Sequence, residues 1–178
     1  MGPTNALCKK ESNLKSKDKA AEGSNNVSHD KVSRAELIKL LNEDLSREYQ
    51  AIIAYVVYSQ VLKGAEYMNI AGELEVHAAQ ELTHAIAIAN QIDYLGGMPA
   101  VTAKPVRTSE SAKEMLQFDL DNETETIRNY RVRVRQCEDL QEYAMGEKIR
   151  EILIDEQDHQ IALATALGKD VPRGSGGA

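Results

Sequence analysis

Two four-residue stretches, Glu81-Leu82-Thr83-His84 and Glu156-Gln157-Asp158-His159, decide how this chain of 178 residues folds. Each stretch places a glutamate and a histidine three positions apart in a helical pattern, so both side chains lie on one face of a helix, about one turn apart. Each glutamate also has an upstream partner: Glu48 precedes Glu81 by as many positions as Glu123 precedes Glu156. The spacing predicts that six side chains from four helices meet at one centre.

A helical hairpin in each half explains this shared separation. Gly64 lies midway between Glu48 and Glu81, and an antiparallel turn at this glycine would bring the two carboxylates to the same level of the bundle. A turn near Asp139 would do the same for the second pair. The six side chains would then meet in the middle of the bundle.

Apolar residues at helical spacing predict four helices. The first follows the capping pattern Ser33-Arg34-Ala35-Glu36 and runs to about Lys63, and the second runs from about Glu66 to Leu95. The third begins near Ser109 or Ser111, a break follows at about 137–141, and the fourth ends at Gly168. Residues 31–168 are therefore expected to form one helical domain.

The segment from Gly96 to Ser109 has no periodicity and contains Pro99 and Pro105, so we expect an irregular connection. Its fourteen or so residues can span about 45 Å, enough to run the length of the bundle. The fold class predicted from the sequence is therefore all-α: a four-helix bundle with one long crossover between the second and third helices.

Composition limits the remaining interpretations. Apolar residues make up 42% of the chain and charged residues 28%, and the net charge of −7 argues against broad nucleic-acid binding by the domain. Cys8 and Cys137 are too few and too far apart for a disulfide framework, which favours a reducing compartment. No apolar run could cross a bilayer and no signal segment is recognisable, so a cytoplasmic protein without membrane contact is expected.

The two ends of the chain differ from the domain. Residues 1–30 are polar and rich in Lys, Ser and Asn, and are expected to form a disordered arm. Lysines between Lys9 and Lys19 form a weak basic patch that could contact DNA, although a solubilising tail is the simpler interpretation. Residues 169–178 are expected to be a flexible Gly-rich tail.

Carboxylate oxygens and imidazole nitrogens without a thiolate favour iron, with manganese as the alternative, over structural zinc. Four glutamates balance the charge of two divalent ions, so two metal ions per subunit are expected. Glu81 and Glu156 are assigned as bridging ligands, Glu48 and Glu123 as terminal ligands, and His84 and His159 complete the set. Bridging carboxylates hold two ions about 3.5–4 Å apart, close enough to act together on one oxidant.

Three further residues have two interpretations each. Tyr55 lies two turns after Glu48 and is either a redox-active or hydrogen-bonding neighbour of the site or an ordinary core tyrosine. His77 lies one turn before Glu81 and is either an additional metal or iron-entry residue or a core histidine. Asp155 is either an orienting partner for a histidine on a neighbouring helix or a surface acid.

Residues 33–168 resemble the ferritin-like superfamily, and the segments Leu45–Ala51, Glu81–His84 and Ile154–His159 resemble bacterioferritins most. The resemblance implies a ferroxidase that oxidises Fe(II) with O2 or H2O2 at a di-iron centre within the subunit and stores Fe(III) in a homo-oligomeric shell. It places the six ligands at Glu48, Glu81, His84, Glu123, Glu156 and His159, and the tyrosine of the site at Tyr55.

Two departures from the bacterioferritin pattern change the expectation. Leu82 stands where the family has the haem-binding Met, so no haem is expected, and no fifth helix follows the fourth. A four-helix subunit of this kind resembles the smaller Dps-like shells, so a 12-mer is preferred to a 24-mer. The alternative functions are a peroxide-scavenging di-iron or di-manganese protein and a DNA-protecting Dps-like protein.

Overall fold

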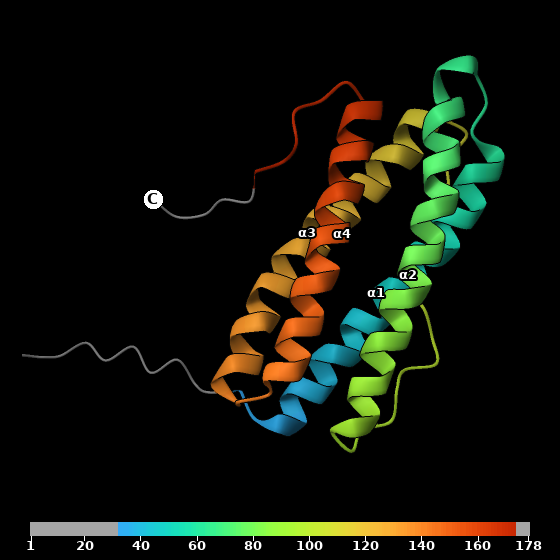
Figure 1. The fold of residues 1–178 in the computed structure, drawn as a ribbon. Helices are drawn as coiled ribbons and strands as arrows, with labels where there is room; N and C mark the ends of the chain where they lie inside the picture. Colours follow the sequence, from blue (N-terminus) through green and yellow to red (C-terminus); the bar gives the residue numbers. More distant parts are fainter. Residues whose placement is uncertain (1–31, 174–178) are drawn as a thin grey trace, which may run out of the picture.

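The chain forms a bundle of four long helices in a computed structural model that describes residues 32–173 (Figure 1). The elements are α1 (Arg34–Val61), the short 3-10 helix η1 (Ala65–Tyr67), α2 (Met68–Tyr94), α3 (Ala112–Asp139) and α4 (Tyr143–Ala166). No strand occurs within residues 32–173. The structure confirms the all-α class and the four-helix bundle. In the same range, no helix is both long and apolar enough to span a membrane.

Serine side chains begin α1 and α3, as the capping patterns predict. The backbone N–H of Glu36 donates to the Ser33 hydroxyl at 3.1 Å, and the backbone N–H of Glu114 donates to the Ser111 hydroxyl at 3.4 Å. The third helix therefore begins after Ser111. Ser109 lies before the first helical residue, and its hydroxyl donates to the carboxylate of Glu114 at 2.6 Å.

The two hairpin turns use different residues. Gly64 has a φ of 122°, which a residue without Cβ adopts at little cost, and it lies in the connection from α1 to α2, directly before η1. The second turn falls at 140–142, where Gln141 has a φ of 62°. The predicted break at 137–141 therefore began too early. Cys137 remains inside α3 because its side chain is fully buried in the core, and the left-handed Gln141 makes the turn.

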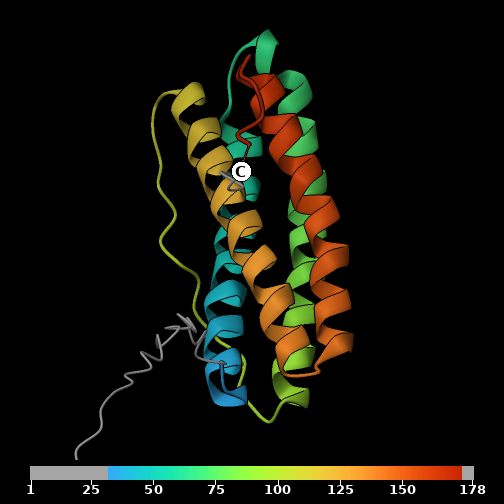
Figure 2. The same ribbon diagram turned by 90° about the vertical axis from the view of Figure 1, so that its left-hand side faces the viewer.

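The crossover between α2 and α3 runs along the outside of the bundle for most of its length, as Figure 2 shows. Hydrogen bonds attach it to α1: the backbone N–H of Lys104 donates to the carbonyl of Ser46 at 2.9 Å, and the Gln50 amide donates to the carbonyl of Pro105 at 2.7 Å. Asn42 bonds the backbone of Met98 and Ala100. The long crossover lets α3 begin at the end of the bundle where α2 begins.

The core consists of two apolar clusters separated by a buried polar layer. One cluster lies around Tyr58, Leu74 and Leu116, and the other around Leu41, Ile88 and Ile149. The helices pack mainly as the hairpins α1–α2 and α3–α4. The C-terminal segment begins against this bundle, because Val171 packs on the first cluster and the carbonyl of Pro172 accepts from Gln160. The predicted arm, residues 1–30, lies outside the described residues.

Candidate metal centre

The polar layer contains all six side chains that the sequence singles out. One glutamate comes from α1, one from α3, and a glutamate–histidine pair from each of α2 and α4. None of the six residues is more than 3% exposed to solvent. The six are Glu48, Glu81, His84, Glu123, Glu156 and His159. Buried charge at this density is costly unless the groups share a common partner.

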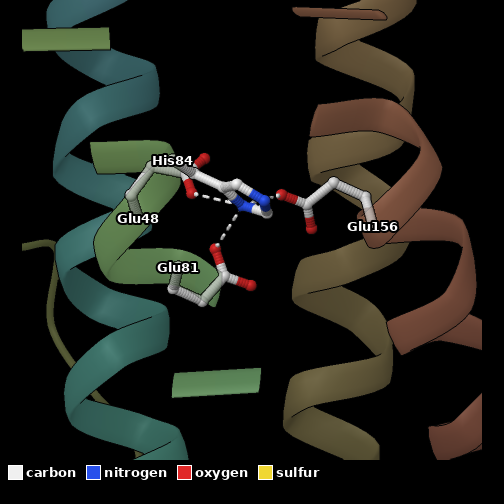
Figure 3. Close-up of side chains that lie close together, drawn as sticks. All are labelled: Glu48, Glu81, His84 and Glu156. Atoms are coloured by element: carbon white, nitrogen blue, oxygen red, sulfur yellow. Dashed lines mark hydrogen bonds and ion pairs between the residues drawn. The ribbon is translucent and has the colours of Figure 1, made fainter. Parts of the chain in front are cut away.

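His84 lies among three carboxylates, as Figure 3 shows. Its Nδ1 is 3.2 Å from Glu81, 3.3 Å from Glu156 and 3.5 Å from Glu48. One donor atom from each of these four residues lies within 4.8 Å of the others, which is a geometry that could hold a metal ion. The carboxylates come from three helices, so only the folded bundle assembles this group.

His159 lies at the centre of a second group of four. Its Nδ1 is 3.0 Å from Glu81 and 3.7 Å from Glu156. Together with Glu123, these residues again place one donor atom each within 4.8 Å of one another. The two groups share Glu81 and Glu156, so each of these carboxylates lies within reach of both groups.

Several donor atoms of the layer have no aligned hydrogen bond within the described residues. They are Glu48 Oε2, Glu81 Oε1, Glu123 Oε2, both carboxylate oxygens of Glu156, and His159 Nδ1. Such atoms are rare in protein cores, because each costs the free energy of its lost hydration. Two divalent cations would satisfy them and balance four negative charges. Oxygen and imidazole donors without sulfur suit iron or manganese.

The carboxylates influence one another's protonation. Burial, followed by the negative charges of neighbouring glutamates, raises the pKa of Glu81 and Glu123 well above the ordinary range. Burial likewise raises the pKa of Glu156, with the charge of Glu48 adding to the effect. Burial also acts on Glu48, but its hydrogen bonds to His84, Glu81 and Tyr130 outweigh it, and the pKa of Glu48 is lowered. The metal-free layer therefore holds protons that cations must displace.

The pKa of each histidine of the layer is raised, although burial alone would lower it. Burial by itself lowers the pKa of an imidazole, but contacts with the surrounding carboxylates raise the pKa of both His84 and His159. In the metal-free protein these rings are therefore part of the charge balance of the layer. A metal ion bound at Nδ1 would replace that positive charge.

The outer nitrogen of each histidine contacts the opposite hairpin. His84 Nε2 lies 3.0 Å from the Asp155 carboxylate, and His159 Nε2 lies 3.0 Å from the Gln80 side-chain oxygen. Asp155 is thus placed as the orienting partner of a histidine on a neighbouring helix. Gln80 was missed in the sequence, although it precedes Glu81 as Asp155 precedes Glu156.

Two buried tyrosines donate hydrogen bonds to the outer glutamates. The hydroxyl of Tyr55 donates to Glu123, and the hydroxyl of Tyr130 donates to Glu48. The sequence pattern did not single out Tyr130 as a site residue. The signal that could have found it is its offset from Glu123, which equals the offset of Tyr55 from Glu48.

Other buried polar residues surround the layer. His77 stacks on His159 with ring centroids 4.0 Å apart and belongs to neither group of four; burial and then the nearby His159 lower its pKa to about 3. Arg133 forms a buried ion pair with Asp44, in which Arg133 Nε lies 2.7 Å from Asp44 Oδ2. Asp119 has a buried oxygen without a hydrogen-bond partner. Sequence reasoning missed Asp44 and Asp119.

The layer has an approximate two-fold symmetry that is visible in the sequence. Each of its residues in the first hairpin is followed, after the same number of positions, by a counterpart in the second hairpin. The pairs that share this offset are Asp44 and Asp119, Glu48 and Glu123, Tyr55 and Tyr130, Gln80 and Asp155, Glu81 and Glu156, His84 and His159. Gln80 and Asp155 differ in chemistry, and the two aspartates differ in surroundings, because Asp44 is paired with Arg133 whereas Asp119 has an oxygen without a hydrogen-bond partner.

Known proteins share this architecture. The model of the ferritin-like domain matches residues 38–171. A bacterioferritin of Brucella melitensis is 29% identical over 132 residues, covering 74% of this chain and 82% of that protein. A bacterial ferritin of Synechocystis sp. is 30% identical over 136 residues, covering 75% of this chain and 85% of that protein.

Solved structures agree with these sequence matches. A ferritin-like diiron-carboxylate protein of Bacillus anthracis has a TM-score of 0.72 and 33% identity, with 75% of this chain and 96% of that chain covered. A dodecameric thioferritin of Bacteroides fragilis, described as bacterioferritin-related, has a TM-score of 0.71 and 27% identity, covering 78% and 88%. This chain therefore belongs to the ferritin-like family and is of the bacterioferritin type.

Proposed function

We propose that this chain is a ferroxidase and iron-storage protein that binds two Fe(II) ions per subunit, oxidises them with O2 or H2O2, and retains the Fe(III) product in a homo-oligomeric shell. The observation that supports this most is the pair of four-residue groups that share Glu81 and Glu156. Glu48 and His84 complete one iron position, and Glu123 and His159 complete the other. Iron is the substrate of this reaction.

The side chains contribute negative charge and a fixed position for the two ions. Two Fe(II) ions give up two electrons, which reduce one O2 with two protons to H2O2, or one H2O2 with two protons to two water molecules. Four carboxylates neutralise the incoming ions, and oxygen-rich ligands favour the ferric product. Tyr55 and Tyr130 fix the outer carboxylates by hydrogen bonds. Burial of the layer excludes bulk water from the reacting ions.

Three observations support an assembly of subunits. Large apolar side chains are exposed along α1 and α2, including Ile53, Val56, Leu82 and Ile86. An open hollow of about 390 Å³ lies between α1 and the crossover, beside Ile53 and Val101. The Bacteroides fragilis thioferritin, which shares the fold, is described as dodecameric. A shell of twelve subunits is our preferred assembly.

The test is an anaerobic titration with Fe(II), followed by a pulse of O2 or H2O2 and optical detection of Fe(III). Wild-type protein should saturate at two ions per chain and oxidise them rapidly. Glu81→Gln removes the charge of a shared ligand and should lower the oxidation rate at least about a hundredfold, as expected when transition-state charge stabilisation is lost. Comparing the two oxidants identifies the preferred one.

The matched control is Glu73→Gln, which makes the same change at an exposed position two turns earlier on α2. This variant should bind and oxidise iron like the wild type. Saturation of the wild type at one ion or none would contradict the proposed function. So would unchanged oxidation in Glu81→Gln.

A further inference from the structure

The two proposed iron positions have the same inner ligands, because each has one outer glutamate, one histidine and the two shared glutamates. These donors alone would make the positions equivalent. The two positions differ at the outer nitrogen, Nε2, of each histidine. His84 contacts the carboxylate of Asp155, whereas His159 contacts the neutral amide of Gln80.

The two contacts have the same length and differ in charge. Both Nε2-to-oxygen distances are 3.0 Å. Both Nδ1 atoms face the shared carboxylates, so a ring that binds a metal ion at Nδ1 carries its proton at Nε2. That proton is donated to a carboxylate from His84 and to an amide oxygen from His159.

A carboxylate acceptor strengthens such a hydrogen bond and makes the imidazole a better electron donor to the metal ion. His84 is only 4% exposed at its side chain, so the bond is shielded on the histidine side, although Asp155 is 39% exposed. Solvent weakens the long-range field of Asp155 but leaves the direct hydrogen bond. Partners of metal-binding histidines change affinity about 10- to 100-fold.

Other departures from symmetry do not place a charged group on the outer nitrogen of either histidine. On the Glu48 side, Arg133 is paired with Asp44. On the Glu123 side, Asp119 has a buried oxygen without a hydrogen-bond partner, and the His77 ring stacks on the face of His159. The Asp155–Gln80 difference is therefore the charged difference that acts directly on a metal-binding histidine.

We propose that the two positions bind metal unequally: the His84 position fills first and more tightly, and Asp155 and Gln80 are the positioning residues that set this order. The inference rests on the proposed function, because it requires two ions in the layer. The expected difference in affinity is about 10- to 100-fold. The His159 position would then be the one that releases its ion more readily.

Calorimetric titration of the metal-free protein with Co(II), without oxidant, tests the order. Wild-type protein should show two binding steps. Gln80→Asp should strengthen the weaker step about 10- to 100-fold and leave the tighter step in place, while Asp155→Asn should weaken the tighter step by a similar factor. Gln157→Asp adds a carboxylate at an exposed position beside Glu156 and should leave both steps unchanged.

Anomalous diffraction from wild-type crystals given one Co(II) per chain locates the first ion, and it does not depend on any variant folding. Higher occupancy beside His84 supports the inference. Equal occupancy, higher occupancy beside His159, two equal binding steps, or a weaker step unaffected by Gln80→Asp would overturn it while leaving the proposed function intact. Saturation below two ions per chain would overturn the proposed function as well.

Discussion

At the scale of single residues, the two tyrosines beside the metal layer stabilise the protein unequally although they occupy equivalent positions. Tyr130 donates to Glu48, whose lowered pKa keeps it charged, whereas Tyr55 donates to Glu123, whose raised pKa favours the neutral acid. Hydrogen bonds to charged groups contribute more to stability than neutral ones.

Urea unfolding of metal-free protein measures this difference. Tyr130→Phe should lower the free energy of unfolding by about 1.5–3 kcal/mol, and Tyr55→Phe by about 0.5–1.5 kcal/mol. Tyr94→Phe, at an exposed position at the end of α2, should change it by less than about 0.5 kcal/mol. Equal losses for the two buried tyrosines would contradict the assigned charge states.

Asp119 should make stability depend on pH. Burial, and then the charge of Glu123, raises its pKa well above the ordinary value of 3.8. Because the folded pKa exceeds the unfolded one, this carboxyl group contributes stability that is fully present below pH 3.8. That contribution is lost progressively as the pH rises through the folded pKa.

Asp119→Asn removes this dependence, since the amide stays neutral. The variant should therefore gain stability relative to the wild type as the pH rises above 3.8, by about 1.4 kcal/mol for each pH unit in which the wild-type carboxyl group stays protonated in the folded state alone. Urea unfolding at three pH values measures the gain. Asp121→Asn, exposed on the same helix, should show no such trend. A constant difference across this range would disprove the shift.

At the scale of elements, the turn between α3 and α4 contains a strained residue. Gln141 has a φ of 62°, its side chain is exposed, and its backbone N–H donates to the carbonyl of Glu138 at 2.9 Å. This left-handed conformation costs a residue with Cβ about 1–2 kcal/mol, whereas glycine adopts it freely.

Gln141→Gly should therefore raise the free energy of unfolding by about 1 kcal/mol, the greater flexibility of glycine in the unfolded chain offsetting part of the gain. Thermal unfolding of the metal-free protein measures the change. Gln141→Ala keeps the strain and should be near neutral. A loss of stability in Gln141→Gly would show that the glutamine side chain has a role in the turn.

At the scale of the whole molecule, the proposed shell predicts a defined particle mass. The chain mass is 19.7 kDa, and sedimentation equilibrium should give twelve times this value rather than twenty-four times. Leu82→Asp together with Ile86→Asp places charges on exposed apolar positions of α2 and should shift the mass toward smaller species.

The expected reason is the cost of burying an unpaired charge at a subunit contact. Glu73→Gln, on an exposed part of α2, serves as the control and should leave the mass unchanged. A wild-type protein that sediments as a monomer would contradict the shell. The iron titration tests oxidation by the single subunit separately.

Much of the fold could be predicted because its signals are local. Helix periodicity, the serine caps and the glycine turn each involve residues within a few positions of one another, and they placed all four helices to within a few residues. The break after α3 was misplaced because no glycine or proline marks it. Gln141 adopts a left-handed conformation that residues other than glycine seldom adopt. The burial of Cys137 in the core keeps this residue within α3.

The spacing of two glutamates and two glutamate–histidine pairs was by itself sufficient to predict six side chains at one level of a four-helix bundle, because helical geometry fixes which residues share a face. The contacts around those side chains depended on the tertiary structure. Tyr130 with Glu48, Arg133 with Asp44, and Asp155 with His84 each join residues far apart in the sequence and on different helices. A pattern along one helix cannot report how neighbouring helices are rotated about their axes, and that rotation decides which acceptor stands behind each histidine.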